Sequence, residues 1–569
     1  MKRFPFVILL LAVSSAAVAQ PTQRYIVGMK SDAVHAAKRA VFADRITEDF
    51  QYLDSFVANL TDTEAQTLRN DPSVRYVESA DIKFFALDAS APAKHIAPMS
   101  HPANAQVTPY GITMVHAPIV WPVGKGDGIN VAIVDTGIDY THPELKDHYQ
   151  GGFNAVTGTN DPRDDDGHGT HVAGIIGAAD NGIGVVGVAP NVKLWSAKVL
   201  APDGNGKATG SNSQIASGLN WVLSKKTELG GNWIVNMSLG QCTDVSVSDQ
   251  CNPNPSLTMQ TACQRLADAG VLVFAASGND STAAHVATVS YPAAFSSVIA
   301  VGALDSTSKI ADFSNQGPEI AVAAPGVGVF STYIVGLGVN AFLTTPNASF
   351  DNFALTGSAK GTQTGQYVYC GLGATAADFP ASVKGNIALI QRGAGISFNL
   401  KTKNALTAGA KAVVIYNCSI AASPTTCTSE TFGNWTLITQ VNGVDDPGDL
   451  AFAWPVAIGI SRADGEALRT ASTSSTLTAT TVVDDYETLN GTSMACPHAV
   501  GVAALVWSVA PTASASAVKT AIFNSATDLG TTGRDTTFGF GLLDAYGAAR
   551  LLNPGAFQVH ARLQGRRGH

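Results

Sequence analysis

Residues 130–137 read Asn-Val-Ala-Ile-Val-Asp-Thr-Gly, and this stretch sets the expected fold class. The β-branched, apolar run Asn130 to Val134 is typical of a strand that is buried on both faces, as in a parallel sheet. Asp135 follows at the carboxyl end, where such sheets gather their reactive groups. Four further runs of this kind lie at 192–199, 233–237, 271–276 and 298–301. Helical stretches lie between the first of these strands, at 171–178 and 214–224. Strands that alternate with helices predict an α/β fold, a three-layer sandwich with a parallel central sheet.

Three short blocks place an acid, a base and a nucleophile in distinctive settings. They are Asp135-Thr136-Gly137, His168-Gly169-Thr170-His171 and Gly491-Thr492-Ser493-Met494-Ala495. Acyl transfer by a serine needs an oxygen nucleophile, an imidazole to take its proton, and a carboxylate to fix the imidazole tautomer. Pro497 is tolerated in a first helical turn, and an apolar face follows it. Ser493 is therefore predicted at the start of a buried helix, where free N–H groups favour a developing oxyanion.

In the chain order Asp, His, Ser, the three blocks resemble the subtilisin-like serine proteases, or subtilases. The resemblance implies that Asp135 orients His168, that His168 is the general base, and that Ser493 is the nucleophile. It also implies that Asn279 donates its side-chain amide to the oxyanion, together with the backbone N–H of Ser493. The predicted function is a serine endopeptidase that hydrolyses peptide bonds in proteins through an acyl-enzyme.

The serine and histidine motifs also have interpretations other than a protease triad. A serine at a helix start often caps the helix, and His168 with His171 near three aspartates suggests a metal site. No His-Glu-x-x-His motif supports that metal site, and by resemblance His171 and His498 are framework residues. Asp139 is expected to serve the turn. Two rival functions are a catalytically silent secreted binding protein on a subtilase scaffold and an esterase, for which no G-x-S-x-G motif is present.

The resemblance also assigns substrate and metal residues. Two strand edges are expected to pair with an extended peptide, namely Gly206-Lys207-Ala208 and Ser238-Leu239-Gly240. No carboxylate marks the pocket for the residue before the cut, so a broad or apolar preference is expected. Calcium is expected as a structural ion and no cofactor as a catalytic one, because residues 180–185 resemble the family's tight calcium loop. The implied oxygen ligands are Glu144, where the family has a shorter aspartate, and Asn181, Ile183 and Val185.

The first 19 residues have the features of a secretory signal peptide. Lys2 and Arg3 precede an apolar run at 6–13, and Ala17-Val18-Ala19 supplies the small-residue cleavage pattern. An uncleaved membrane anchor is the competing interpretation, but the apolar run falls short of the ~20 residues that a spanning helix needs. The mature protein is therefore expected to be secreted and free of the membrane.

Domain boundaries follow from changes in pattern. Residues 20–85 give a strand, two helices and a strand, and Asp-Pro-Ser-Val-Arg-Tyr-Val-Glu-Ser-Ala at 71–80 resembles the subtilase pro-domain, which implies an intramolecular inhibitor. A small accessory domain that stays attached is the alternative. Residues 86–108 are expected to be the linker and maturation region. The catalytic domain is predicted at 109–338 and 476–552, the C-terminal tail at 553–569, and an insert at 339–475. Around 384–417 the insert resembles the protease-associated (PA) domain, which makes gating of substrate access or self-association possible roles.

Composition is that of a folded protein without a nucleic-acid partner. Of 569 residues, 45% are hydrophobic and 14% are charged, and the net charge is −9. The basic pair Arg566-Arg567 is too small a cluster for a nucleic-acid surface. Export permits disulfides, and with seven cysteines at least one stays unpaired within the chain. Cys496 is the expected unpaired residue, and Cys242 and Cys251 bracket a polar loop that a disulfide could close.

Overall fold

The computed structural model describes residues 21–87, 105–204, 207–243, 251–282, 285–350, 352–420, 425, 427, 435–441, 444–471 and 475–558. The signal peptide predicted at 1–19 and most of the predicted C-terminal tail lie outside these residues. The chain forms two compact units, residues 1–80 and residues 81–569. The segment 81–87 folds with the second unit, so the last residues of the pro-domain predicted at 20–85 belong to that unit.

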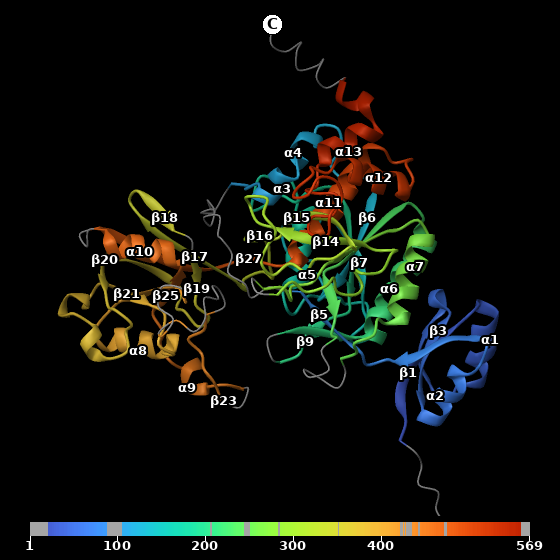
Figure 1. Ribbon diagram of the computed structural model, residues 1–569, viewed down its shortest axis with the longest axis horizontal. Coiled ribbons are helices and arrows are strands. Elements are labelled where there is room, and N and C mark those ends of the chain that lie inside the picture. Colours follow the sequence, from blue (N-terminus) through green and yellow to red (C-terminus); the bar gives the residue numbers. More distant parts are fainter. Residues whose placement is uncertain are drawn as a thin grey trace, which may run out of the picture. The chain divides into compact units, whose positions relative to one another are not determined.

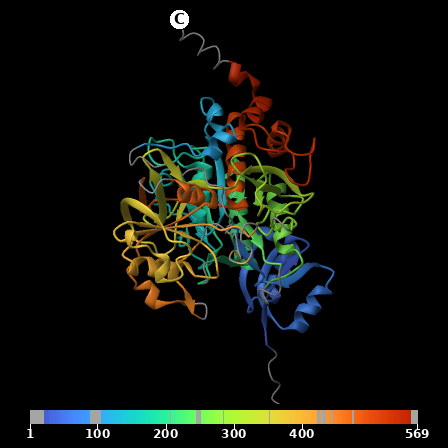
Figure 2. The ribbon, with the colours of Figure 1, turned by 60° about the vertical axis from the view of Figure 1, so that its left-hand side comes forward.

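The N-terminal unit is a four-stranded antiparallel sheet with two helices on one face (Figures 1 and 2). The strand order is β2-β3-β1-β4, and Val27, Phe56 and Leu68 are among the residues of its core. The elements are β1 (Gln23–Met29), α1 (Asp32–Val41), β2 (Ile46–Phe50), η1 (Gln51–Leu53), β3 (Ser55–Leu60), α2 (Asp62–Arg69) and β4 (Val74–Ser79). The sequence analysis missed β2 and β3, because the polar β2 has no apolar period and the αL residue Asp54 turns the chain into β3.

A seven-stranded parallel sheet forms the centre of the second unit and confirms the predicted fold class. Its order is β15-β14-β13-β11-β6-β8-β7. The strands are β6 (Ile129–Asp135), β7 (Tyr149–Asn154), β8 (Lys193–Lys198), β11 (Asn232–Met237), β13 (Leu272–Ala276), β14 (Ile299–Leu304) and β15 (Ile320–Pro325). Five of them coincide with the predicted runs. The edge strand β7, with the sequence Tyr-Gln-Gly-Gly-Phe-Asn, was not predicted because an edge strand needs no apolar run on both faces.

Helices cover both faces of this sheet, which gives the three predicted layers (Figure 1). On one face α5 (His168–Gly177) and α11 (Thr492–Val509) pack on Val131 and Ile133 of β6. On the other face α6 (Asn212–Leu229) and α7 (Leu257–Asp268) contact the strands. Among the described residues, α11 alone has the length and composition of a membrane span, but 94% of that window is buried in the protein, so it is a core helix. The remaining helices are α3 (Tyr110–Met114), α4 (Ala117–Val120), α12 (Ala515–Ser525) and α13 (Ala545–Leu552).

An insert interrupts the second unit between β16 (Val329–Thr332) and β27 (Tyr486–Leu489), which pair antiparallel at its root. Its eight-stranded sheet has the order β18-β17-β26-β20-β21-β22-β25-β19. The strands are β17 (Gly338–Thr345), β18 (Ala348–Phe350), β19 (Asn352–Ala354), β20 (Gly361–Tyr369), β21 (Ile387–Gln391), β22 (Ala412–Tyr416), β25 (Val456–Ile460) and β26 (Thr476–Asp484). The predicted end at residue 475 is too early, because β26 returns beside β17 and completes the sheet of the insert.

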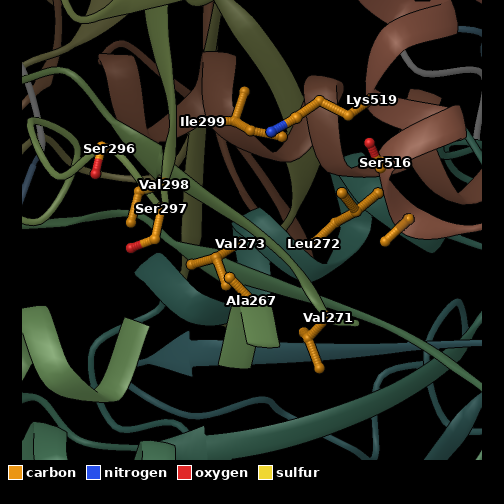
Figure 3. A pocket seen from close by; sticks show the side chains of 11 residues that line it. Ala267, Val271, Leu272, Val273, Ser296, Ser297, Val298, Ile299, Ser516 and Lys519 are labelled. Atoms are coloured by element: carbon orange, nitrogen blue, oxygen red, sulfur yellow. The ribbon is translucent and has the colours of Figure 1, made fainter. Parts of the chain in front are cut away.

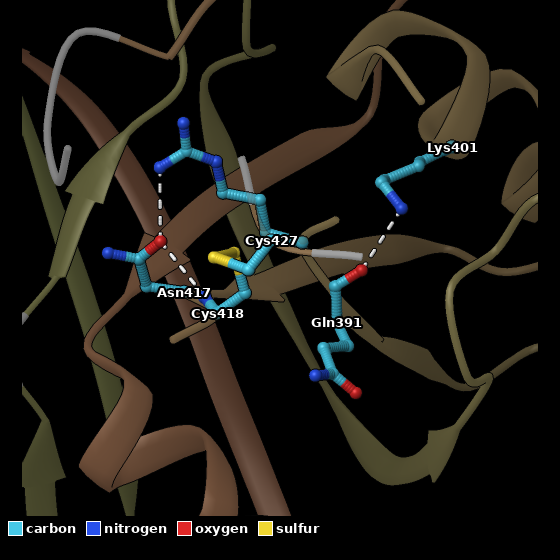
Figure 4. The surroundings of a disulfide bond; sticks show 6 residues. Gln391, Lys401, Asn417, Cys418 and Cys427 are labelled. Carbon is cyan, nitrogen blue, oxygen red and sulfur yellow. Dashed lines mark hydrogen bonds between the residues drawn. A yellow bond between two sulfur atoms is a disulfide. The ribbon is translucent and has the colours of Figure 1, made fainter. Parts of the chain in front are cut away.

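Helices and a disulfide complete the insert. The helices are α8 (Phe398–Thr407), α9 (Pro447–Leu450) and α10 (Arg462–Thr470), with short turns η2 (Ala376–Asp378) and η3 (Ala381–Val383) and a ribbon of β23 (Gln440–Val441) and β24 (Val444–Asp445). Strand β21, helix α8 and strand β22 coincide with the unit predicted at 384–417. Figure 4 shows the disulfide Cys418–Cys427 beside Asn417 and, on α8, the buried Lys401, which donates to the backbone oxygen of Gln391 at 3.0 Å. Burial lowers the pKa of Lys401 to about 8.

The cysteines divide into two bonded pairs and three buried thiols. Cys242 and Cys251 form the disulfide that the sequence suggested, and Cys418 and Cys427 form a second one. Cys263, Cys370 and Cys496 are unpaired and buried. Burial raises the pKa of the Cys496 thiol well above its usual range, so this cysteine is the inert core residue that the sequence analysis expected.

Candidate active site

The acid and the base of the predicted triad meet at the edge of the central sheet. Asp135 is the last residue of β6, and His168 is the first residue of α5. The imidazole Nδ1 lies 2.6 Å from Asp135 Oδ1, and both side chains are buried. The turn before α5 depends on Gly167, which has φ of 109° and against which the ring of Tyr333 packs so closely that a Cβ would lie 2.2 Å from it. This turn brings the imidazole onto the carboxylate.

Hydrogen bonds around Asp135 fix the carboxylate and hence the imidazole tautomer. The Thr136 N–H donates to Asp135 Oδ1 at 2.7 Å, and the Thr136 hydroxyl accepts from the Gly169 N–H at 2.8 Å. A carboxylate accepts hydrogen bonds, so the proton of the neutral imidazole resides on Nδ1. His168 Nε2 is then the nitrogen that can accept a proton from a substrate or a nucleophile.

The predicted nucleophile lies in the first turn of α11. Ser493 follows Gly491, whose φ of 151° breaks the strand direction before the helix begins. The Ser493 hydroxyl donates to the Ser238 backbone oxygen at 3.0 Å, and the Ser238 hydroxyl donates back to the Ser493 backbone oxygen at 2.9 Å. Helices α5 and α11 are in contact, so the histidine and the serine stand at the starts of two packed helices. This pair of bonds holds the first turn of α11 at the carboxyl end of β11.

Asn279 is held so that its amide donates in one direction. Its Oδ1 accepts from the backbone N–H and from the hydroxyl of Thr492, at 2.9 and 2.8 Å. Its Nδ2 donates to the backbone oxygen of Leu87 at 2.6 Å. Because two donors hold Oδ1, the NH₂ group is aimed at a carbonyl oxygen beside the start of α11. This is the geometry that an oxyanion donor requires.

The backbone of Lys83–Leu87 lies between the two strand edges predicted to hold substrate. Strand β5 (Lys83–Ala86) is flanked by β10 (Ala208–Ser211) and β12 (Leu239–Gln241) in a sheet that also includes β9 (Ala201–Pro202) (Figure 1). Phe85 pairs with Thr209 on one side and with Gly240 on the other, both antiparallel. An extended peptide bound by backbone pairing on both sides is the expected way of holding a substrate.

Side chains of this segment mark two pockets. Phe84 is fully buried, whereas Leu87 packs against Gly240, where a Cβ would lie 3.1 Å from a methyl carbon of Leu87. The Leu87 N–H donates to the Ser238 oxygen at 3.3 Å, so the predicted edge of Ser238, Leu239 and Gly240 lies beside this segment. The other predicted edge differs: Gly206 lies outside the described residues, Lys207 stands over the Phe85 ring, and after Ala208 the pairing runs through Thr209 to Ser211.

A hollow elsewhere on the unit is not part of this site. It has a volume of about 140 Å³, and Figure 3 shows Val271, Leu272, Val298 and Ile299 around it, with Lys519 on one side. These residues stand at or just before the amino ends of β13 and β14. The triad lies at the opposite, carboxyl ends of the strands, where sheets of this type bind their ligands.

Comparisons with known proteins agree with this geometry. The Subtilase family model matches residues 126–363 and 385–541, which is more than half of the chain. This chain is a subtilase. Subtilisin E of Bacillus subtilis (strain 168) is 35% identical over 330 residues, which cover 57% of this chain and 76% of that protein. Subtilisin DY of Bacillus licheniformis is 42% identical over 230 residues, covering 40% and 76%.

A solved structure extends the likeness to the fold. The psychrophilic subtilisin-like protease Apa1 from the Antarctic psychrotroph Pseudoalteromonas sp. AS-11 superimposes with a TM-score of 0.56 at 30% identity, covering 79% of this subtilase and 99% of Apa1. Together these likenesses establish the subtilase as a serine endopeptidase, a hydrolase that acts on peptide bonds. They do not favour the silent binding protein, and Asp135, His168 and Ser493 are all present in this chain.

Two further histidines of the subtilase are buried in framework positions. His171 Nε2 lies 3.1 Å from the backbone oxygens of Val329 and Glu487, and His498 Nδ1 lies 2.8 Å from that of Met494. Carbonyl oxygens accept only, so these ring nitrogens carry protons and donate. Burial lowers the pKa of His171 to about 3 and that of His498 to about 4. Neither contact is one of a metal ligand.

These two histidines predict a loss of stability in acid. Because the pKa of each is lower in the folded state than the unfolded value of about 6.5, the unfolded state binds protons first as the pH falls. The stability is fully present above pH 6.5 and is lost between pH 6.5 and about 4, by about 2 kcal/mol per histidine at pH 5. The thermal midpoint of the Ser493→Ala chain, which cannot digest itself, is expected to be lower at pH 5 than at pH 7.

A variant separates this effect from that of other titrating groups. His498→Gln retains a donor for the Met494 oxygen but does not titrate, so the difference between its midpoints at pH 7 and pH 5 is expected to shrink. His285→Asn replaces an exposed histidine and is expected to leave the difference unchanged. A difference as large in His498→Gln as in the parent would show that this buried histidine does not contribute.

The residues predicted to bind calcium lie together in the subtilase, although their oxygens already have donors. Glu144 is fully buried and accepts from the Tyr486 hydroxyl at 2.9 Å and from Asn181 Nδ2 at 3.1 Å. Asn181 Oδ1 accepts from the Ile183 N–H at 3.1 Å. Burial raises the pKa of Glu144 to about 7 and raises that of Tyr486 above its usual range.

Sequence reasoning missed three residues that shape this site. Thr492, within a quoted motif, orients the amide of Asn279, but the motif alone does not show what the hydroxyl contacts. Leu87 lies at the start of the predicted linker, where nothing in the local pattern marks a segment that lies in the cleft. Tyr486 follows the insert in the chain, so its meeting with Glu144 depends on a separation of 342 residues that no local pattern encodes.

Proposed function

We propose that this subtilase is a secreted endopeptidase made as a proenzyme, which frees its own cleft by cutting the peptide bond after Leu87. One contact carries the proposal: the Leu87 backbone oxygen accepts from Asn279 Nδ2 at 2.6 Å. The oxygen of a scissile carbonyl takes this position in a serine endopeptidase, because the amide donor stabilises the charge that develops there. The Leu87 N–H on the Ser238 oxygen holds the same residue from the other side.

The chemistry follows from the positions of the side chains. The Ser493 hydroxyl turns from the Ser238 oxygen, gives its proton to His168 Nε2 and attacks the carbonyl carbon of Leu87. The carbonyl oxygen becomes negative and is stabilised by Asn279 and by the backbone N–H of Ser493 at the start of α11. Asp135 holds the imidazolium without taking its proton.

The same residues complete the cycle. The imidazolium donates its proton to the leaving amine, and the acyl chain stays on Ser493 Oγ until water, activated by His168, releases it. The two half-reactions use only side chains and water, so the chemistry itself needs no cofactor. Protein substrates are expected to follow the same course once the segment has left the cleft.

The pockets around the segment indicate the substrates. Leu87 packs against Gly240 and Phe84 is buried three residues before it, so both pockets accept apolar side chains in the bound segment. We therefore propose substrates with leucine or a similar apolar residue before the cut and an aromatic residue three positions earlier. This supports the apolar preference expected from the sequence.

Inhibition and export complete the proposal. Because residues 83–87 pair with both β10 and β12, no second peptide can pair with these edges while the segment stays. We assign the N-terminal unit as the pro-domain, which supports an intramolecular inhibitor role through this attached segment. Homologous subtilisins are secreted proteases, and the signal peptide predicted at 1–19 supports export of this one. The insert is assigned as a PA domain on the likeness at 384–417, and self-association through it stays a prediction.

Changing Leu87 tests the proposal. Leu87→Asp is expected to slow the first self-cleavage at least about tenfold, because a charge would have to enter an apolar pocket beside Gly240. Leu87→Met keeps the volume and is expected to be cut at nearly the parent rate. The measurement is mass analysis of the purified chain over time, with the N-terminus of the first large fragment expected at Asp88. A first fragment that begins elsewhere, or Leu87→Asp cut as fast as the parent, would contradict the proposal.

A further inference from the structure

We propose that a hydrogen-bonded clasp, formed by Glu144, Asn181 and Tyr486, takes the place of a calcium ion in the loop at 180–185. Glu144 has no exposed surface, and both of its carboxyl oxygens have donors. The Tyr486 hydroxyl donates to Oε1 at 2.9 Å, Asn181 Nδ2 donates to Oε2 at 3.1 Å, and the Val185 N–H also bonds to the carboxyl group. These three donors use three of the about four lone-pair sites of the carboxyl group, so a calcium ion bound by both oxygens would have to displace at least one of them.

Three further oxygens around the loop are engaged in the same way, and the backbone oxygens of the implied ligands Ile183 and Val185 are not among them. Gln106 Oε1 accepts from the N–H groups of Asn181 and Gly182, at 2.9 and 2.8 Å. The backbone oxygens of Gly182 and Gly184 accept from Gln106 and Val107, at 3.0 and 2.7 Å. Calcium takes six to eight oxygen ligands at about 2.3–2.6 Å. Several of these hydrogen bonds would have to break at once to provide such a set.

Space at the clasp is filled as well. A Cβ on Gly184 would lie 1.9 Å from the Tyr486 hydroxyl oxygen and 2.0 Å from Glu144 Oε1. The phenol and the carboxyl group therefore pack directly on the backbone of the loop. Glu144 has a longer side chain than the aspartate that the family has at this position. This extra length brings its carboxyl group to the phenol of Tyr486.

Tyr486 ties the clasp to the root of the insert. It is the first residue of β27, which leads from the insert to α11, and it pairs with Thr332 of β16. His142 makes a second link between the same two segments. Its Nδ1 accepts from the Glu144 N–H at 3.1 Å, so Nε2 carries the proton and donates to the Asp485 backbone oxygen at 2.9 Å. The His142 ring stands edge-on to Tyr486 at 5.3 Å. Segments 142–144 and 485–486 are thus joined by a bond between two side chains and by one between a side chain and the backbone.

The clasp is expected to make the stability of this loop independent of calcium. The test uses the full chain with Ser493→Ala, which prevents self-digestion, and compares thermal unfolding in CaCl₂ and in EDTA. Tyr486→Phe removes one hydrogen bond to a carboxyl group and is expected to lower the midpoint by about 1.5–3 °C, equally in both buffers. Glu144→Gln removes the charge that a calcium ion would need, and its shift between the two buffers is expected to equal that of the parent.

Two outcomes would overturn the proposal. One is a calcium-dependent rise of the midpoint in the parent that disappears in Glu144→Gln, which would make Glu144 a metal ligand. The other is a Tyr486→Phe chain that is as stable as the parent in EDTA. If Glu144→Gln does not fold, terbium binding to the Ser493→Ala chain decides between the two. Terbium luminescence that the phenol of Tyr486 excites, and that Tyr486→Phe abolishes, would show an ion at the clasp. The absence of this luminescence supports the clasp.

Discussion

Ser493→Ala is expected to leave the chain intact, where the parent cuts itself, and to lower kcat for peptide hydrolysis by about 10⁶; this magnitude is one established for a subtilisin, a relative of this protein. The reason is that no other described group can replace the oxygen. The Ser493 hydroxyl stands at the start of α11, bonded to the Ser238 oxygen, and Thr492 beside it already donates to Asn279. Without Oγ no acyl-enzyme forms, and the remaining donors only polarise the carbonyl of Leu87.

Mass analysis measures the intact chain over time, and casein hydrolysis measures activity on proteins. Ser508→Ala is the matched control, because Ser508 lies on the same helix and its hydroxyl bonds only to Leu505 and Gly126. This control is expected to mature and to hydrolyse casein. A trace of the parent enzyme is expected to cut the Ser493→Ala chain, which would show that the variant is folded and cleavable. Self-cutting by pure Ser493→Ala would contradict the triad.

The fold could be read from the sequence where burial on both faces leaves a continuous apolar run. Strands β6, β8, β11, β13 and β14 are of this kind, and each was predicted within three residues at both ends. Edge strands such as β7 were missed, because their solvent side admits Tyr, Gln and Gly. The boundary of the insert was missed for another reason: β26 alternates Thr with apolar residues, and only its pairing with β17 shows to which sheet it belongs.

The residues of the site likewise fall into those that a local pattern marks and those that only the completed fold brings together. Asp135, His168 and Ser493 each occupy a local setting, namely a strand end or a helix start, so short motifs sufficed to predict them as the triad. The strand Lys83–Ala86 has no such signal, because its place depends on two edges more than 100 residues away. The clasp of Glu144 and Tyr486 likewise joins segments that are distant in the chain. Contacts of that kind follow from the completed fold and leave no signal in a short stretch of sequence.

Asp135→Asn is expected to lower kcat by about 10⁴ while KM changes little, as in serine proteases whose triad aspartate is replaced in this way. The cause is the proton on the imidazole. In the parent, Asp135 Oδ1 accepts from His168 Nδ1 at 2.6 Å and from the Thr136 N–H at 2.7 Å. Because one oxygen faces both donors, an NH₂ group in the place of Oδ1 in the variant faces Nδ1, and the Thr136 N–H gives up its bond.

An NH₂ group donates, so Nδ1 would accept and the ring proton would move to Nε2. His168 could then no longer take the proton of Ser493, although the side chains keep their places and substrate still binds. The measurement is kcat and KM on a peptide amide that ends in leucine before the cut, using enzyme whose segment 81–87 has been removed by the parent in trans. Asp161→Asn, an exposed carboxylate outside the site, is the control and is expected to keep the parent kcat. An Asp135→Asn enzyme with a raised KM and an unchanged kcat would mean that Asp135 only shapes the cleft.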